Sequence, residues 1–259
     1  MIVFIIPLKS RKVSAHWEKV SQLFERCLKS VCHQTDSDFH VIVVCHEKPE
    51  ISFQHSNVSY VEADFPPPGS DIRDRRIDKG KKTIIGLRKA LAFQPNHAMI
   101  VDADDCLSCR VAEFVNKHPN ANGWFINQGY VYQEKSPFIY FRKAHFHHWC
   151  GTCNIAKFSL WPLPESDNHY PTQLIDYYSG CNHKHIEKEL KKNGTPLQPL
   201  PLTGVTYIIG NGENIYQKGF STIHRSNQDK PFFMLKELVK FRLLTSAIRR
   251  EFGITPISS

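Results

Sequence analysis

The sequence has no long apolar stretch. None of its uninterrupted apolar runs approaches the roughly 18 residues that a membrane-spanning helix needs. The first residues, MIVFIIPLKS, also lack the basic segment and the small-residue cleavage site of a secretory signal. We therefore expect a chain that does not cross a bilayer and that stays in the cytoplasm.

The eight cysteines follow no spacing typical of a disulfide framework. In a chain without an export signal, reduced thiols are the better expectation. Two CxxC pairs, at 106–109 and 150–153, supply four thiols, and three histidines at 145–148 precede the second pair. The pairs lie about 40 residues apart, beyond the usual zinc-ribbon interval. Buried thiols are the first interpretation and a structural zinc site is the alternative.

Acidic residues are fewer than basic ones. The chain holds 33 Lys and Arg against 25 Asp and Glu, which gives a formal net charge of +8. Such a charge favours a polyanion, an anionic membrane surface or a phosphorylated ligand. The basic residues match no RNA-binding or DNA-binding motif, so we expect no nucleic acid partner.

Apolar runs alternate with helical periodicity through the first hundred residues. Strands are predicted at 2–7, 40–45, 58–63 and in HAMIVDADD, at 97–105, and a helix is predicted from 14 to 32. This alternation predicts an α/β fold with a mainly parallel central sheet flanked by helices. Ligands bind such sheets at the carboxyl ends of the strands.

The second half of the chain is less regular. GWFINQGYVY and GVTYIIG have the composition of strands, and HKHIEKELKKNG predicts a helix that ends at Gly194. No internal repeat or linker is evident. We predict one domain over 1–229, with a ligand-binding half at 1–125 and an acceptor half at 126–229.

Residues 230–254 place apolar side chains at helical spacing with Lys and Arg between them. We predict a basic amphipathic helix there, followed by a tail to residue 259. Such a helix can pack on its own domain, pair with a second copy or lie on an anionic membrane. Membrane contact would place the protein at the inner face of the cytoplasmic membrane.

Three carboxylates, Asp102, Asp104 and Asp105, follow the apolar run AMIV. Clustered carboxylates repel one another, so such a site is usually held by a cation or by raised pKa values. Mg²⁺ and Mn²⁺ prefer oxygen ligands, and Mg²⁺ commonly combines one or two carboxylates with substrate phosphates. The turn therefore indicates a metal site for a nucleotide diphosphate. An ordinary acidic helix cap is the alternative.

The segment DIRDRRIDKGKK, residues 71–82, carries six Lys or Arg residues and three Asp. We predict a loop with a helix beginning near Lys79 or Gly80, capped by Asp78. A helix N-terminus favours phosphate, so this loop is a candidate diphosphate contact. A solvated, self-paired run of charges is the alternative.

Four stretches together resemble a known family. FIIPLKSR, SVCHQTDSDFHVIVVCHE, DKGKKTIIGLRKAL and MIVDADD look like a family 2 glycosyltransferase of the GT-A fold, over roughly residues 1–130. The resemblance implies a single GT-A-like (Rossmann-like) domain. It also implies a metal-dependent, hexosyltransferase-like enzyme that moves a sugar from a UDP- or GDP-sugar to a hydroxyl acceptor. The acceptor would be a glycan or a lipid-linked molecule, in surface polysaccharide or glycolipid synthesis.

The resemblance also implies roles for single residues. Asp102 and Asp104 match the DxD motif that holds Mn²⁺ or Mg²⁺, and Asp105 often accompanies them. Glu47 is the nearest equivalent of an acidic residue after the second strand. Asn211 stands where many such enzymes place a late histidine on the metal, and His224 follows further on. The nucleotide-binding residues implied are Pro7, Leu8, Glu47, Arg76, Asp78, Lys79, Asp102, Ala103 and Asp104.

The catalytic base is less well defined. The family mostly inverts the anomeric centre, and an acidic residue takes the proton of the acceptor hydroxyl. That residue usually opens a helix in an acidic pair, which the stretch near 182 lacks. The candidates are Glu165, Asp167, Asp176 and His183.

Two other functions stay open at this point. A nucleotidyltransferase would use a similar sheet and metal, but it would be expected to show a glycine-rich loop after the first strand. PLKSRKVSAH contains no glycine. A non-enzymatic, zinc-stabilised basic module is the third possibility, and stoichiometric bound zinc would support it.

Overall fold

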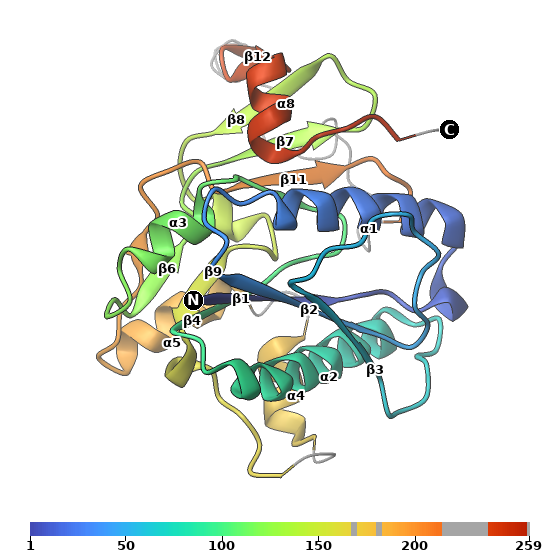
Figure 1. Cartoon of the computed structure of the whole chain (residues 1–259), viewed down its shortest axis with the longest axis vertical. Helices are drawn as coiled ribbons and strands as arrows, with labels where there is room; N and C mark the ends of the chain where they lie inside the picture. The colour runs from blue at the N-terminus through green and yellow to red at the C-terminus, as the bar shows by residue number, and fades with distance from the viewer. Residues whose placement is uncertain (167–169, 180–182, 214–237, 258–259) are drawn as a thin grey trace, which may run out of the picture.

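The computed structural model describes residues 1–166, 170–179, 183–213 and 238–257. Its centre is a seven-stranded sheet in the order β10-β6-β9-β4-β1-β2-β3 (Figure 1). The four strands β4, β1, β2 and β3 are parallel, and β9 runs antiparallel to both β4 and β6. The strands of this sheet are β1 Ile2–Pro7, β2 Phe39–Cys45, β3 Val58–Glu62, β4 His97–Ile100, β6 Gly123–Phe125, β9 Asn154–Lys157 and β10 Gln198–Pro199.

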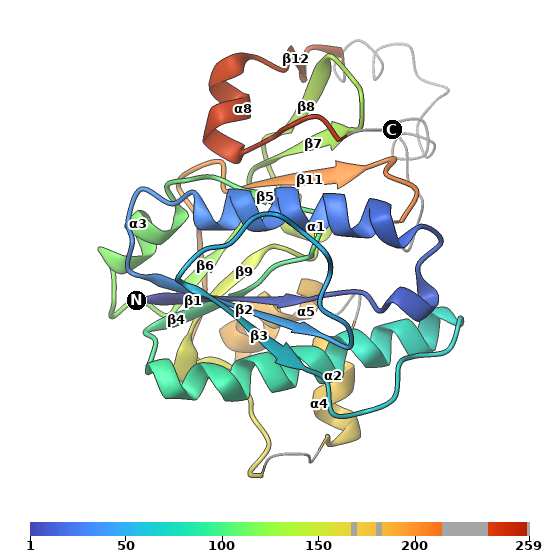
Figure 2. The ribbon, with the colours of Figure 1, turned by 45° about the vertical axis from the view of Figure 1, so that its right-hand side comes forward.

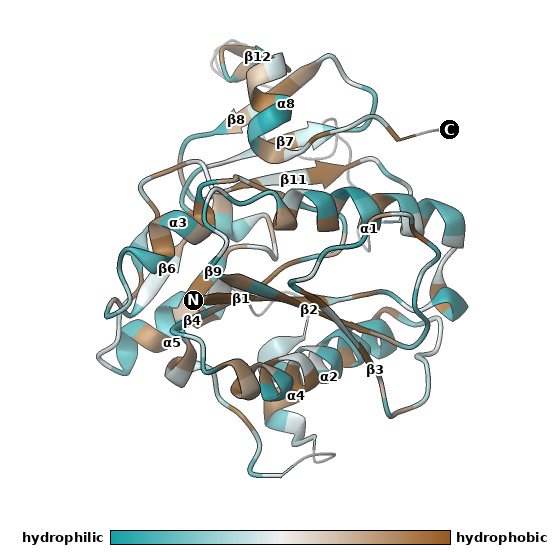
Figure 3. Ribbon diagram, in the orientation of Figure 1, coloured by the Kyte–Doolittle hydropathy of each residue, from teal (hydrophilic) through white to brown (hydrophobic). Residues whose placement is uncertain are grey.

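Strand β1 is buried on both faces because its side chains alternate between two cores. Phe4 and Ile6 pack in one core with α1, whereas Val3 and Ile5 pack in the other with α2. Helices α1 and α2 therefore cover opposite faces, and the strands between them are hydrophobic while the outer helix surfaces are polar (Figure 3). The predicted α/β class with a mainly parallel, helix-flanked sheet is confirmed. The helices are α1 Trp17–Cys32, α2 Ile72–Ala90, α3 Val111–Asn116, α4 Thr172–Tyr178, α5 His183–Lys192 and α8 Ser246–Phe252.

A second sheet has the order β12-β8-β7-β11-β5, and α1 lies between it and the central sheet (Figure 2). The predicted strand at 123–132 is therefore two strands, one in each sheet. The predicted helix end at Gly194 is confirmed, since that glycine follows α5 with a φ of 79°. The strands of the second sheet are β5 Cys106–Leu107, β7 Gly129–Gln133, β8 Phe138–Arg142, β11 Val205–Ile209 and β12 Phe241–Leu243.

The predicted loop at 71–82 is wrong. Helix α2 begins at Ile72, and the side chain of Asp71 caps it by accepting from the backbone N–H of Arg73. Asp78 therefore lies inside the helix and caps nothing. The first turns of α2 are exposed and charged, so they show no apolar periodicity from which their helical state could be predicted.

The predicted continuous helix over 230–254 is wrong at residues 241–243, and its helical state is confirmed at 246–252. Residues Phe241–Leu243 form β12, which pairs antiparallel with β8. Among the residues described from 241 onward, the helical segment is Ser246–Phe252, between a Thr245 cap and Gly253 at a φ of 62°. Phe241 lies opposite Tyr140, with ring centroids 5.3 Å apart, so tertiary pairing overrides helical spacing. Residues 230–237 lie outside the described residues, and the domain boundary at 229 stays a prediction, as does the division at 125. Within the described chain, no helix has both the length and the apolar character to cross a membrane.

Two glycines offer a test of the packing between β6 and β9. A Cβ on Gly123, at a φ of 126°, would lie 2.1 Å from the carbonyl oxygen of Ile155, whereas a Cβ on Gly194 would meet nothing within 4 Å. Gly123→Ala should lower the free energy of unfolding by about 3 kcal/mol, because overpacking adds to backbone strain. Gly194→Ala should cost only about 1 kcal/mol of backbone strain. Urea unfolding measures both, and equal losses would contradict this packing.

Candidate functional site

The acidic turn lies at the carboxyl end of β4, beside the end of β1. The backbone N–H of Val101 donates to Ile5, which extends the pairing between the two strands, and the N–H of Asp105 then donates to the carbonyl of Asp102 at 3.1 Å. The turn after β4 is thus closed by its own backbone. Its three carboxylates have different surroundings.

Asp105 is fully buried and faces the protein interior. Its carboxylate accepts hydrogen bonds from the Thr152 hydroxyl at 2.6 Å, the Cys150 thiol at 3.1 Å and the backbone N–H of Ile208 at 3.2 Å. Burial, together with the charges of the two neighbouring aspartates, raises the pKa of Asp105 well above its ordinary value. Asp105 therefore holds the turn in place and is not turned toward an external ligand.

Asp104 is half-buried and accepts a hydrogen bond from the Asn211 amide nitrogen at 2.8 Å. The other end of that amide accepts from the backbone N–H of Glu213. Burial and the charge of Asp102 raise the pKa of Asp104 to about 6, although the bond from Asn211 lowers it. The structure thus brings together Asp104 and Asn211, the residue at the position where the family resemblance implies a late metal contact.

Asp102 forms an ion pair with Lys79, which extends from α2 across the end of the sheet. Both side chains are about one quarter exposed, at 26% and 22%. Burial lowers the pKa of Lys79, but the neighbouring carboxylates outweigh that effect and the pKa is raised. The second oxygen of Asp102 faces Gly151, where a Cβ would lie only 2.4 Å away. Only glycine lets the chain before β9 approach the carboxylate this closely.

The predicted base-binding residues lie at the ends of β1 and β2. Pro7 is the last residue of β1, and the Leu8 side chain is fully buried. Glu47 accepts from the backbone N–H of Arg11 at 3.2 Å and the Ser10 hydroxyl at 3.5 Å, so it holds the turn after β1. Ala103 is half-buried between the two outward aspartates. These residues frame one edge of the sheet beside the acidic turn.

Asp78 belongs to a buried cluster rather than to an exposed surface. Its carboxylate lies 2.8 Å from the ammonium of Lys82 and 3.6 Å from Nδ1 of His46. Lys82 is fully buried and also donates to the Leu8 carbonyl at 2.7 Å. Burial raises the pKa of Asp78 and lowers those of Lys82 and His46. The cluster fixes α2 against the turn after β1. Arg76, one turn before Gly80, is half-buried.

The candidate bases are less well placed. Glu165 is exposed after the fourth short 3-10 turn, Phe158–Leu160, and Asp176 is exposed on α4. His183 begins α5, but its side chain is not among those described. Asp167 and His224 lie outside the described residues.

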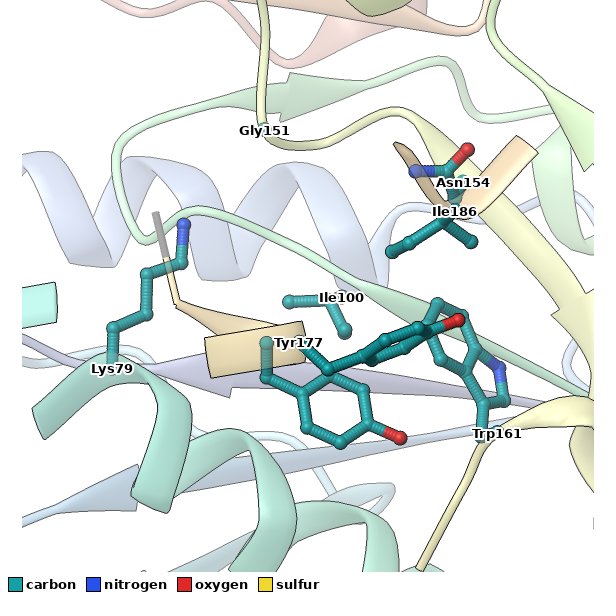
Figure 4. A pocket seen from close by; sticks show the side chains of 8 residues that line it. Lys79, Ile100, Gly151, Asn154, Trp161, Tyr177 and Ile186 are labelled. Carbon is teal, nitrogen blue, oxygen red and sulfur yellow. The ribbon is translucent and has the colours of Figure 1, made fainter. Parts of the chain in front are cut away.

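A pocket beside Lys79 lies between the end of β4, the start of β9 and helices α4 and α5 (Figure 4). Sequence reasoning missed its aromatic wall, because Trp161, Tyr177 and Tyr178 come from segments too short to show periodicity. The Tyr178 hydroxyl donates to the Pro162 carbonyl at 2.6 Å, which fixes that ring. The residues that line the pocket are Lys79, Ile100, Gly151, Asn154, Trp161, Tyr177, Tyr178 and Ile186.

The two CxxC pairs do not form a metal site. Cys106 and Cys150 are fully buried, and burial raises the pKa of both thiols. Cys150 donates to Asp105, and Cys153 accepts from the Asn154 amide. Among the described residues, no group of three or more His, Cys, Asp or Glu side chains is arranged to hold an ion. All seven described cysteines are free thiols, and the first interpretation, buried thiols, is confirmed for six of them, while Cys109 is half-buried.

Comparisons with known proteins give only distant likenesses. No protein-family model and no curated protein sequence matches the chain. Staphylococcus aureus TarS, residues 1–349, is 14% identical over 82% of this chain and 61% of its own, with a TM-score of 0.46. The same fragment in complex with UDP has a TM-score of 0.45, at 13% identity over 80% of this chain and 60% of its own. The 4-diphosphocytidyl-2C-methyl-D-erythritol synthase of Anaerococcus prevotii has a TM-score of 0.43, at 12% identity over 86% of this chain and 93% of its own.

The chain spans about three fifths of the TarS fragment. Because every one of these TM-scores is below 0.5, the likenesses establish no function. What the site can do follows from its own residues.

The buried carboxyl of Asp105 gives a test of how the turn is held. Asp105→Ala leaves three donors without an acceptor, and each buried donor left unsatisfied costs about 1–3 kcal/mol. Asp105→Asn keeps a carbonyl for the Ile208 N–H, and its NH₂ can donate to the Thr152 hydroxyl once that hydroxyl turns from donor to acceptor. We expect a loss of about 3 kcal/mol or more in unfolding free energy for the alanine variant and about 1 kcal/mol for the asparagine variant. If both variants lost the same unfolding free energy in urea, the stability of the turn would require an ionised carboxylate at position 105.

Proposed function

We propose that this chain is a metal-dependent glycosyltransferase that moves a sugar from a UDP- or GDP-sugar to a hydroxyl of a glycan or lipid-linked acceptor. We place the reaction in surface polysaccharide or glycolipid synthesis, in the cytoplasm at the inner face of the cytoplasmic membrane. The observation that supports it best is that the three carboxylates of the acidic turn face different surroundings. Asp105 faces inward, whereas Asp102 and Asp104 remain at the carboxyl end of a parallel strand, where ligands of such sheets bind.

The side chains of this turn fit a divalent cation. Two carboxylates two residues apart supply the oxygen ligands that Mg²⁺ and Mn²⁺ prefer, and a diphosphate and water supply the rest. Gly151 places no side chain against one oxygen of Asp102, and the other oxygen already binds a cation, the Lys79 ammonium. Asp102 and Asp104 would hold the metal ion, which supplies charge neutralisation to the leaving diphosphate.

Lys79 acts on the diphosphate through its own charge. Helix α2 begins at Ile72, so its N-terminus lies well before Lys79 and the helix dipole does not explain phosphate binding here. The ammonium is instead held at the site by Asp102. An oxygen of the donor diphosphate that reaches this position accepts a charge-assisted hydrogen bond from Lys79.

The acceptor side belongs to the second half of the chain. Trp161, Tyr177 and Tyr178 line the pocket beside Lys79, and the rings of Trp161 and Tyr178 are buried. An acid or histidine from Glu165, Asp167 or His183 takes the acceptor proton during an inverting, in-line attack.

The proposal is tested by thermal unfolding with UDP, GDP, CDP, CTP and nucleotide sugars, with and without Mn²⁺. A ligand at 100 times its Kd adds about 2.7 kcal/mol, which in a chain of this size raises Tm by about 5 °C or more. We expect this rise for one diphosphate family only, in the presence of Mn²⁺, and its loss in Asp104→Asn. The control Glu18→Gln removes an exposed carboxylate of α1 and should keep the rise.

Two results would contradict the proposal. One is the absence of a shift with any nucleotide in protein shown to be folded. The other is a shift of equal size in Asp104→Asn. A response to a nucleoside triphosphate without a response to any nucleotide sugar would instead support a nucleotidyltransferase.

The role of Lys79 gives a second prediction. Lys79→Met should weaken nucleoside diphosphate binding by about tenfold or more, since a hydrogen bond to a charged group contributes about 1.5–3 kcal/mol. Binding of the free nucleoside, measured by the same calorimetric titration, should not change. Lys79→Arg should restore part of the diphosphate affinity. An equal loss for nucleoside and diphosphate would mean that Lys79 only maintains the local structure.

A further inference from the structure

The outer end of the second sheet carries a group of exposed apolar side chains. The described residues include seven large hydrophobic residues that are exposed, and four of them lie in or beside β8 and β12. Leu243 of β12 pairs directly with Phe138 of β8, and they are 64% and 46% exposed. Leu238 and Val239, just before β12, are 61% and 76% exposed. We call these four residues, with the strands that carry them, the β8–β12 tip.

The tip is an extension of a buried face. Along each strand, alternate residues share one face of the sheet. Phe138 therefore lies on the same side as Tyr140, which is buried, and Leu243 on the same side as Phe241. The apolar face thus continues past the core into solvent. Strand β12 is at the edge of its sheet, at the end of the molecule farthest from β3 (Figure 1).

Basic residues predominate in the sequence around the tip, with Glu237 and Glu251 directly flanking the second of the two stretches that carry them. Residues 138–149 and 238–250 contain six Lys or Arg side chains and no Asp or Glu. The guanidinium of Arg242 lies 4.3 Å from the centre of the Phe141 ring, and that of Arg142 lies 3.8 Å from the Trp149 ring. The six basic residues are Arg142, Lys143, Lys240, Arg242, Arg249 and Arg250.

From these observations we propose that the β8–β12 tip docks on an anionic lipid bilayer. A bilayer surface offers an apolar layer for Leu238, Val239 and Leu243, and anionic head groups for the surrounding Lys and Arg side chains. A nucleic acid would satisfy the charges but would leave the exposed aliphatic side chains without an apolar partner. A neutral surface would leave the excess positive charge without a counterpart.

This surface differs from the amphipathic helix predicted over 230–254. The apolar side chains are presented by a strand pair and the turn before it, because residues 241–243 are extended. The proposal does not depend on the transferase reaction. Helix α2 packs on the central sheet and the acidic turn follows β4 of that sheet, whereas the tip is part of the second sheet.

The test is co-sedimentation of the full chain with vesicles of phosphatidylcholine alone or with about one third phosphatidylglycerol. We expect binding only to the anionic vesicles, with weaker binding at high salt, since each basic residue near the surface contributes about fivefold in affinity. The double variant Val239→Asp/Arg242→Glu should bind at least tenfold more weakly. The matched control Leu91→Asp/Lys89→Glu makes the same change in charge at the exposed end of α2 and should bind as the unmodified chain does.

Three results would overturn the proposal. One is equal binding to neutral and anionic vesicles, and another is an equal loss of binding in the tip and control variants. The third is that the chain binds no vesicles but forms a concentration-dependent dimer, which the tip variant abolishes. The last result would assign the tip to a second copy of the chain. Circular dichroism confirms that each variant is folded. The nucleotide-induced rise in Tm should persist in the tip variant, so failure of this proposal is distinguishable from failure of the proposed function.

Discussion

The arrangement of the site depends on one buried carboxyl group. Asp105 receives hydrogen bonds from the chain just before β9 and from β11, so it joins the end of the central sheet to the second sheet. Removing a carboxyl from water is costly unless donors surround it, and three donors fix it in one orientation. Because the Asp105 side chain is buried, Asp102 and Asp104 are the two partly exposed carboxylates at the carboxyl end of β4. The same connection brings Asn211, just after β11, to Asp104.

Helix α2 contributes two lysines to the site, one of them fully buried and the other partly exposed. Lys82 is fully buried and joins the turn after β1 to Asp78, while Lys79, one turn earlier, extends to Asp102. Residues three apart on a helix are neighbours on its surface, so fixing Lys82 in the interior also fixes the direction of Lys79. Gly80 allows the helix to approach α4 closely, since a Cβ there would lie 2.7 Å from the Ile175 carbonyl. The position of the Lys79 side chain thus depends on how Asp78, Gly80 and Lys82 of the same helix pack.

The sequence is informative where apolar periodicity is strong and where carboxylates follow it. The runs at 2–7 and 40–45 are strands because their β-branched side chains are buried on both faces, and the acidic turn lies at the strand end as predicted. The start of α2 could not be predicted from periodicity, because its first turns are charged and solvent-facing. Strand β12 was missed because Phe241 has helical spacing to its neighbours but gains more by pairing with Tyr140. Which of the three aspartates faces inward depends on Thr152 and Ile208, which are distant in sequence.

The central claim is that Asp102 and Asp104 hold a divalent cation against a nucleotide diphosphate. The most direct measurement is a crystal structure with UDP or GDP and Mn²⁺, with data collected at the manganese absorption edge. We expect an anomalous peak between Asp102, Asp104 and the diphosphate, with Lys79 moved from Asp102 onto a phosphate oxygen and Asp105 still buried. A bound nucleotide with no manganese between these carboxylates, and with the ion pair between Lys79 and Asp102 intact, would contradict it.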